Sequence, residues 1–327
     1  MKRKGYLISA FTASLLLCAG GILLGAGMAQ GGSPVFYYDG DKISVREQTR
    51  PTVLKDHVLE ETVLESIENL NISVRDARLE IQEGSTFGLE YRINGYVQEP
   101  EWSVTDNTLR FKESSQYQES AAYPYWVSEW WGYEPYQSAE EPFVRITIPK
   151  DTSFSRVTLE SSSGEIKISC NLQAEKIKIL SSYGDIYAES LICETGSVES
   201  HSGICKIDSI EGGKAELNCY SGSIRLREVK TKCTVFMEYG DLYVSVLEEG
   251  SLDAQLHTGN AVIIPEGSLE NFSFSLHTGS GKIMMPGGMV MAENEYGEKV
   301  PALDYVKLRE TKASLCLYTE NGDMKVY

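Results

Sequence analysis

Eight short units with a central glycine recur along the second half of the chain and constrain its fold more than any other feature. They include Ser-Ser-Gly-Glu-Ile, Ser-Tyr-Gly-Asp-Ile and His-Thr-Gly-Asn-Ala. The first seven glycines are 18 to 20 residues apart, and the last follows after 43 residues, about two periods: Gly164, Gly184, Gly203, Gly222, Gly240, Gly259, Gly279 and Gly322. A fixed period of this length is typical of proteins in which each repeat packs on its neighbours.

Apolar residues hold the same positions around every one of these glycines. The positions seven and five before the glycine, and two and four after it, are apolar in 30 of 32 cases, with Gly196 and Gly281 as the exceptions. Alternation with a period of two predicts a strand on each side of a tight turn, with one face of each strand buried. A helical face would show a three-to-four rhythm instead, so helix is excluded almost throughout.

The constant phase favours an all-β, β-helix-like solenoid with rungs of about 19 to 20 residues over a meander of hairpins. In a solenoid every rung repeats the same corner in the same register, and equivalent residues form columns about 4.8 Å apart. A second corner is indicated by three prolines after apolar residues, because proline tolerates strand ends but not a central ladder. These are Pro149, Pro265 and Pro286.

The same spacing of apolar residues extends upstream, where Ala77 and Asn107 stand in the place of the central glycine. Asparagine is a residue type that tolerates a left-handed turn. We therefore assign residues 68–327 to the solenoid. Residues 30–67 are interpreted as a tether and an N-terminal cap that covers the open edge of the first rung. Within this segment we expect short strands at residues 36–38 and 43–45 and a helix at residues 52–67.

The N-terminus predicts a single membrane anchor. Residues 5–29 contain no charged residue and follow three cations, Lys2, Arg3 and Lys4. About 25 residues at 1.5 Å each exceed the hydrocarbon core, and cations on one side indicate its cytosolic end. We expect one N-terminal transmembrane helix at residues 5–29, a cytosolic tail at residues 1–4 and a C-terminal domain outside the cell membrane. A cleaved signal peptide and lipid attachment at Cys18 stay open as alternatives.

Charge and cysteine content narrow the function further. The net charge is −17 despite the basic N-terminus, which argues against binding to nucleic acid or anionic lipid. Six cysteines lie beyond Cys18. Three of them fall on inward positions and are interpreted as small core residues, although a disulfide among the six stays open. Those three are Cys205, Cys219 and Cys233.

Acidic residues follow the repeat glycines directly, at Glu165, Asp185, Asp241 and Asp323. On neighbouring rungs two carboxylates would lie near 5 Å, the separation used by retaining glycosidases. Asp and Asn after glycine are also ordinary turn residues, however, and no cleft is indicated. We therefore predict no catalytic residues and no enzyme, with a polysaccharide-cleaving β-helix enzyme as the third hypothesis.

Two further columns carry polar residues. The histidines two before the glycine are interpreted as a solvent-facing ladder rather than a metal site, with the last two on neighbouring rungs: His201, His257 and His277. We expect no metal and no cofactor. Three after the glycine, Lys167, Lys206, Arg225, Lys282 and Lys325 share a column with Tyr187 and Tyr243. This row is interpreted as a solvent-exposed sheet face. The alternative is a surface that binds an anionic wall polymer.

The strongest departure from the repeat lies at residues 115–141, where aromatic residues concentrate and three of the four tryptophans fall within six residues. Irregular insertions in solenoids emerge as loops on one side, and exposed aromatic rings are typical of recognition surfaces. The candidate ligand-binding residues are Tyr125, Trp126, Trp130, Trp131 and Tyr133. In the alternative interpretation this loop folds back and covers the solenoid.

The anchor, the opening Ile-Glu-Asn-Leu-Asn-Ile-Ser-Val at residues 67–74, the Ala-Arg-Leu-Glu-Ile at residues 77–81 and the serial Ser-Gly-Glu/Asp-Ile units together resemble a known family. This is the bacterial, membrane-anchored "putative adhesin" β-strand-repeat family, a domain of unknown function. It includes the anchored protein of a cell-envelope stress operon. The resemblance covers roughly residues 67–327 and implies a right-handed β-helix-like fold outside the cytoplasm. It brings no catalytic residues.

These observations predict a non-enzymatic cell-surface binding or adhesion module that displays a β-solenoid outside the membrane. Its expected partner is a cell-wall polymer, a glycan or a surface protein, with the membrane contacted through the N-terminal helix. The alternative is an accessory protein in cell-envelope stress sensing that acts through a membrane partner, because four cytosolic residues leave no room for an output domain.

Overall fold

The computed structural model describes residues 16, 19–23, 25–27, 30, 36–38, 43–45, 55–95, 97–116, 141–247, 250–310 and 313–327. The chain divides into two compact units. The first comprises residues 1–55, 95–97 and 116–138, and the second comprises residues 56–94, 98–115 and 139–327.

In the first unit, β1 (Phe36–Tyr38) pairs antiparallel with β2 (Ile43–Val45), which confirms the two short strands expected there. Residues 19–23 and 25–27 are helical, and most of the predicted anchor lies outside the described residues. No helix among the described residues has both the length and the apolar character needed to cross a membrane.

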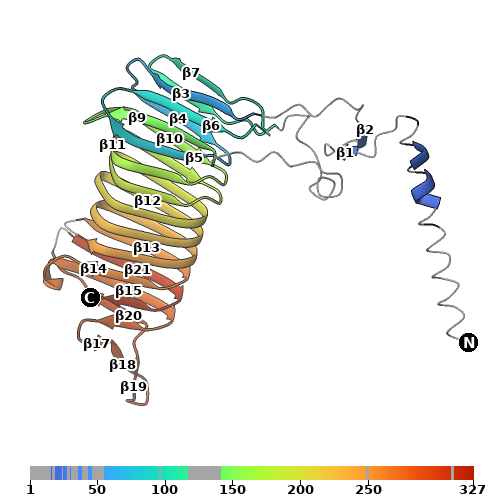
Figure 1. Cartoon of the computed structure of the whole chain (residues 1–327). Helices are drawn as coiled ribbons and strands as arrows, with labels where there is room; N and C mark the ends of the chain where they lie inside the picture. Colours follow the sequence, from blue (N-terminus) through green and yellow to red (C-terminus); the bar gives the residue numbers. More distant parts are fainter. Residues whose placement is uncertain are drawn as a thin grey trace, which may run out of the picture. The chain divides into compact units, whose positions relative to one another are not determined.

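The second unit is an all-β solenoid with one winding sheet of 18 strands, in which the strands stack as the rungs of Figure 1. β12 alone runs without interruption through three repeat corners. The strands of the sheet are β3 (His57–Val63), β4 (Asn69–Val74), β5 (Arg78–Gly84), β6 (Gly88–Ile93), β7 (Glu101–Thr105), β8 (Thr108–Lys112), β9 (Phe143–Pro149), β10 (Ser153–Ser161), β11 (Ile166–Ser181), β12 (Ile186–Leu247), β13 (Ser251–Thr258), β14 (Ala261–Pro265), β15 (Phe272–Ser280), β16 (Ile283–Met285), β17 (Gly288–Met289), β20 (Asp304–Lys307), β21 (Ala313–Asn321) and β22 (Met324–Val326).

Two smaller elements stand beside the sheet. A 3-10 turn, η2 (Leu269–Asn271), precedes β15, and a separate hairpin joins β18 (Met291–Glu293) to β19 (Lys299–Pro301). The prolines mark strand ends as expected, since β9 ends at Pro149, β14 ends at Pro265, and β16 ends immediately before Pro286.

The repeat glycines form one column of stacked corners. A Cβ added at Gly222 would lie 2.0 Å from the carbonyl oxygen of Gly203, and one added at Gly240 would lie 1.6 Å from that of Gly222. Gly222 also has a φ of 145°, a conformation that residues with a side chain rarely adopt. Glycine is therefore required at this corner both for close backbone approach and for its conformation.

The predicted buried columns form the core. In the Gly164 rung all four predicted side chains are at most 1% exposed: Val157, Leu159, Ile166 and Ile168. Parallel pairing brings Val157 and Leu159 opposite Leu70 and Ile72 of β4, and Ile166 opposite Leu79 of β5. Ala77 consequently occupies the corner column, next to Gly164.

The C-terminal rung is inserted between two earlier rungs. β21 pairs in parallel with β13 on one edge and with β15 on the other. The order of rungs is therefore β13–β14, then β21–β22, then β15–β16, whereas the sequence period was interpreted as continuous stacking. β20, antiparallel to β15, and β17, antiparallel to β16, follow at this end.

The same register corrects one repeat assignment. Ser280 pairs with Asn321, and a Cβ on Gly281 would lie 2.0 Å from the carbonyl oxygen of Gly322. The corner glycine of this rung is thus Gly281 and not Gly279. With this change the positions five before and two after the corner are Leu276 and Ile283, at most 1% exposed, and the apparent exception at Gly281 disappears.

The N-terminal end is also out of sequence order. β4 and β5 lie between the β10–β11 rung and a rung made of the later strands β8 and β9. Outside this rung, β6 pairs antiparallel with β9, β3 with β6, and β7 with β8. Antiparallel strands therefore cap the solenoid where a bare parallel edge would invite association with other chains.

Two predictions for this end are wrong. The segment assigned to a helix at residues 52–67 contains β3, because pairing with β6 gives its backbone partners that local spacing does not reveal. Asn107 has the left-handed conformation that its residue type suggested, with a φ of 53°, but it joins the antiparallel hairpin of β7 and β8 instead of forming a solenoid corner.

Candidate binding surface

The five aromatic residues predicted to bind a ligand lie outside the described residues: Tyr125, Trp126, Trp130, Trp131 and Tyr133. The described part does show where their insertion leaves the solenoid. β8 pairs with β4 and β9 pairs with β5 in one rung. The described chain therefore leaves this rung after β8 and returns to it at β9, beside the corner of Ala77.

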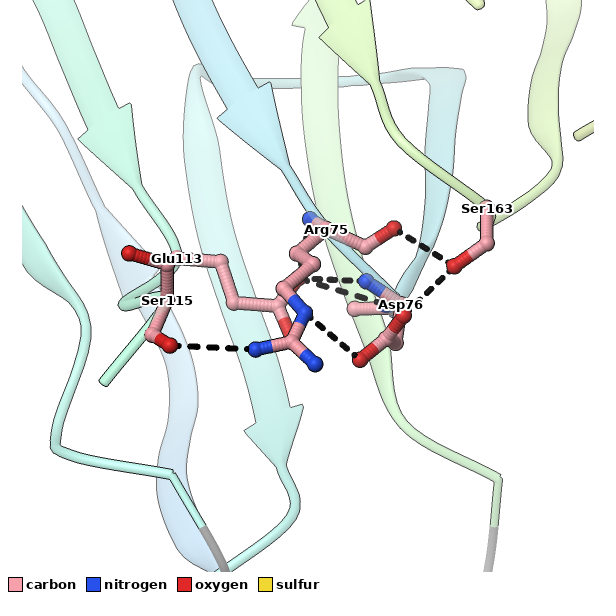
Figure 2. Close-up of polar contacts among 6 residues, drawn as sticks. Arg75, Asp76, Glu113, Ser115 and Ser163 are labelled. Carbon is pink, nitrogen blue, oxygen red and sulfur yellow. Dashed lines mark hydrogen bonds and ion pairs between the residues drawn. The ribbon is translucent and has the colours of Figure 1, made fainter. Parts of the chain in front are cut away.

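A buried carboxylate binds the N–H groups of the Ala77 corner. In ordinary rungs the corner N–H groups donate to carbonyls of the preceding rung, as those of Ser163 and Gly164 do to Arg75 at 2.7 and 3.1 Å. The N–H groups of Arg75, Asp76 and Ala77 instead donate to one carboxylate oxygen of Glu113, at 2.6, 3.2 and 3.2 Å (Figure 2). Three successive N–H groups aimed at one anion form a backbone nest.

The side chains around Glu113 connect this nest to the start of the insertion and to the next rung. Arg75 donates to the Ser115 carbonyl at 3.1 Å, at the start of the insertion, and forms an ion pair of 3.1 Å with Asp76. Asp76 in turn accepts a hydrogen bond from Ser163 of the next rung (Figure 2). Burial raises the pKa of the Glu113 carboxyl above its ordinary value, against the lowering effect of the three N–H groups.

The acidic residues after the corners hold the backbone of adjacent rungs. An Asp185 oxygen accepts from the Ile204 N–H at 2.7 Å, and an Asp241 oxygen accepts from the Asn260 N–H at 2.8 Å. Asp323 accepts from the Lys282 N–H at 2.9 Å. These carboxylates therefore act as structural links between rungs, and the pattern that suggested glycosidase chemistry has this other explanation.

The basic-aromatic row borders a shallow groove of about 550 Å³. Its lining includes Lys206, Arg225 and Tyr243, from three successive rungs, together with Arg227 and Asp208 two positions further along the strands. The Arg225 guanidinium lies over the Tyr243 ring at 5.7 Å. Lys282 does not belong to this row, because it directly follows the true corner Gly281.

The histidine column is rearranged by the inserted C-terminal rung. His257 and His277 were expected on neighbouring rungs, but the rung of Tyr318 and Glu320 separates them. His257 pairs with Glu320, and His277 pairs with Asp304 of β20. Among the described residues, no group of three or more His, Cys, Asp or Glu side chains is arranged to hold a metal ion.

These histidines belong to two groups of rings on five rungs, which we together call the aromatic ladder: Tyr220, Tyr239 and His257 in one group, and the stacked pair of Tyr318 and His277 in the other. Its rings lie 6.0 Å apart between Tyr220 and Tyr239, and 6.2 Å apart between Tyr239 and His257. His277 and Tyr318 stack at 5.2 Å with nearly parallel planes. The tyrosines are 43 to 60% exposed, so the ladder is a solvent-facing surface across five rungs.

The cysteines of the solenoid form no disulfide among the described residues, where all six are free. Cys205 and Cys233 are buried in the core columns as predicted, and burial raises the pKa of each thiol to about 12. Such thiols stay protonated and unreactive at neutral pH.

The family described as Toastrack DUF4097 matches residues 67–327. The chain belongs to this family. The match begins at the start of the inner rungs, covers the whole of the solenoid from there on, and agrees with the "putative adhesin" repeat resemblance of the sequence.

Solved structures similar to this Toastrack chain include two bacterial proteins. A "putative adhesin" from Bacteroides fragilis shares 14% identity over 85% of this chain and 99% of its own, with a TM-score of 0.46. Another from Parabacteroides distasonis shares 9% identity over 83% of this chain and 97% of its own, with a TM-score of 0.41. No curated protein matches the sequence.

Sequence reasoning found part of the exposed surface of this Toastrack solenoid. It identified Lys206, Arg225 and Tyr243 by their shared distance from a corner glycine, but missed Arg227, which stands five after Gly222 in the same outward phase. It also found the histidines without their tyrosine neighbours. The signal was present, since Tyr220 and Tyr239 lie two and one residues before their corners.

Proposed function

We propose that this chain is a non-enzymatic cell-surface binding module, which displays its solenoid outside the membrane and binds a glycan of the cell wall. The single observation that carries this proposal is the aromatic ladder. Three rings from successive rungs and a stacked pair from the next two rungs face solvent, on a scaffold whose backbone is fixed by pairing on both sides.

An exposed ladder of this kind suits a sugar polymer. Tyrosine and histidine rings present an apolar face with a polar edge, which complements a sugar ring that has apolar faces and hydroxyl edges. Five rungs at about 4.8 Å span roughly 19 Å, so several sugar units would contact the ladder together. Pairing with Glu320 and Asp304 fixes the two imidazole rings before a ligand arrives, which reduces the entropy lost on binding.

The cellular location is part of the same proposal. The uncharged residues 5–29 after three cations would anchor the chain in the cell membrane with its solenoid outside. The aromatic insertion would add a second binding element through Trp126, Trp130 and Trp131. Right-handed winding remains the expectation that the family resemblance gives.

Co-sedimentation of the full-length protein, in mild detergent, with purified cell-wall sacculi tests this proposal. We expect the parent protein to pellet and the variant Tyr220→Ala/Tyr239→Ala to stay largely in solution. The control Tyr296→Ala/Tyr327→Ala also removes two exposed tyrosines, 80% and 59% exposed, and should pellet like the parent.

A third variant carries alanine at Trp126, Trp130 and Trp131 and measures how much the insertion contributes to sacculus binding. Equal pelleting of the parent and the ladder variant would refute the role of the ladder. Failure of the parent to pellet would refute wall binding itself.

A further inference from the structure

The groove after the corners is a second surface, distinct from the aromatic ladder before them. Its outward side chains form two columns of three on successive rungs. Lys206, Arg225 and Tyr243 stand three residues after their corners, and Asp208, Arg227 and Ser245 stand five after them. Neighbours within a column are about 4.8 Å apart, and the two columns are about 7 Å apart along the strands.

The charge of this groove is opposite to that of the molecule. Three cations and one carboxylate line it, whereas the chain carries −17. Lys206 approaches Asp208 only at 3.9 Å, and Arg227 approaches Glu228 at 3.5 Å, with half or more of each cationic side chain exposed. Arg225 has no carboxylate within 4.0 Å in the described part of the chain.

Two other cations of the solenoid, Arg145 and Lys230, are neutralised more closely than those of the groove. Arg145, near the capped end, lies between Glu80 and Glu90 at 2.9 and 2.8 Å. Lys230 lies 3.1 Å from Glu228 and 3.4 Å from Glu211. The groove therefore keeps positive charge that is free to attract an anion, and long-range attraction is strongest where such charges are clustered.

The donors of the groove fit a phosphate better than a carboxylate. Two guanidinium forks, one ammonium and the hydroxyls of Tyr243 and Ser245 all donate hydrogen bonds, while Asp208 is the one acceptor that disfavours an anion. A carboxylate has two oxygens in one plane. The tetrahedral oxygens of a phosphate can reach donors in both columns and on adjacent rungs at the same time.

We infer that this groove is a binding site for the phosphate groups of an anionic polymer. The polymer would lie along the columns, with one phosphate near Arg225 and Arg227 and the next toward Lys206. The inference rests on the proposed function only in placing such a polymer in the cell envelope. Binding at the groove itself does not depend on the aromatic ladder.

Fluorescence anisotropy of labelled long-chain inorganic polyphosphate, titrated with the full-length protein in mild detergent, tests this inference. We expect Arg225→Gln/Arg227→Gln to weaken binding about 10-fold or more. The control Lys214→Gln/Lys232→Gln removes the same charge from exposed positions eight residues before their corners, and should change binding less than about 2-fold.

Two further arms sharpen the result. Poly-glutamate of matched charge and length should bind about 10-fold more weakly than polyphosphate if phosphate geometry matters. The variant Lys206→Gln, which alters one exposed side chain, should weaken binding about 3-fold and replaces the double variant if that one loses its cooperative thermal transition.

An equal loss of polyphosphate affinity in the control variant would mean that binding depends only on the overall charge, and would overturn the site. Equal binding of poly-glutamate would overturn the choice of phosphate, and absence of binding by the parent would overturn both. The ladder variant Tyr220→Ala/Tyr239→Ala should keep full polyphosphate binding. Sacculus binding through the ladder and polyphosphate binding through the groove therefore fail or succeed independently.

Discussion

The middle of the solenoid and its two ends differ in whether the order of their rungs in space follows the order in sequence. From the Gly184 corner to the Gly259 corner, each rung stacks on the rung that precedes it in sequence. At both ends a rung is placed out of order: β4–β5 lies inside the later β8–β9, and β21–β22 lies inside the earlier β15–β16.

This difference shows how an open-ended repeat can be closed. A solenoid whose last rung were also last in space would end in a parallel edge held on one side only. Inserting the terminal rung gives β21 hydrogen-bonded neighbours on both edges, so the chain end is held by two rungs. Local period therefore organises the middle, and contacts distant in sequence secure the ends.

Removal of the inserted rung should have the largest effect. Ending the chain at residue 310 deletes four large buried apolar side chains, Leu315, Leu317, Met324 and Val326, at about 1.5 to 3 kcal/mol each. We expect the end to lose roughly 6 kcal/mol or more and residues 251–310 to lose amide-exchange protection. Protection of β11 should persist because its rung partners remain. Unchanged protection of β15 would show that insertion does not secure the end.

A corner glycine of the middle should come next. In Gly222→Ala the new methyl group would meet the Gly203 carbonyl at 2.0 Å, so the backbone must separate. We expect a loss of about 4 kcal/mol or more in free energy of unfolding, measured by denaturant titration. The matched variant Gly297→Ala, near the C-terminal end, also changes a glycine of positive φ but has open space around it. It should lose about 1 kcal/mol.

The nest at the base of the insertion should give an intermediate effect. Glu113→Ala leaves one buried and two partly buried N–H groups without their acceptor and should cost about 3 kcal/mol in stability. Glu113→Gln keeps an acceptor oxygen and should cost less. Denaturant midpoints of both variants, beside Glu65→Gln at an exposed position, measure this.

The pH dependence of the Glu113→Gln effect has a defined sign. Because burial raises the pKa of Glu113 in the folded state, the folded protein holds this proton more tightly than the unfolded chain. That stabilisation is present below the unfolded pKa and is lost as the pH rises through the folded pKa. The advantage of the parent over Glu113→Gln should therefore shrink as the pH rises above the ordinary pKa of a glutamate, about 4.3. An advantage that grows would mean that the three N–H groups dominate.

The sequence was sufficient for the middle of the fold and insufficient for the ends. Val157, Leu159, Ile166 and Ile168 were placed correctly because period-two burial is a local property. The choice between Gly279 and Gly281 was not local, since two glycines two residues apart fit the same alternation. Only pairing with β21 decides it.

The candidate surfaces divide in the same way. Lys206, Arg225 and Tyr243 lie in the sequential middle, so counting from the corner found them. The neighbours of His257 were misassigned because Glu320 comes from the inserted rung, 63 residues away. Glu113 gave no repeat signal, because its carboxylate binds the N–H groups of Arg75, Asp76 and Ala77 from the end of a strand that no repeat glycine follows.

The alkylation rates of the native cysteines should show the smallest effect. They compare the middle with the inserted rung in the unaltered protein. Cys205 and Cys233 are buried in the middle, with the pKa of each thiol raised to about 12, whereas Cys316 is exposed on the inserted rung. At pH 8 an alkylating reagent should modify Cys316 first, and the other two at least about 1,000-fold more slowly, because they react only through large-scale opening. Peptide mapping by mass spectrometry resolves each site, and denatured protein gives the reference rates. Comparable rates for Cys205 and Cys316 would mean that the middle opens as readily as the end, and that stacking in sequence order does not make it the more stable region.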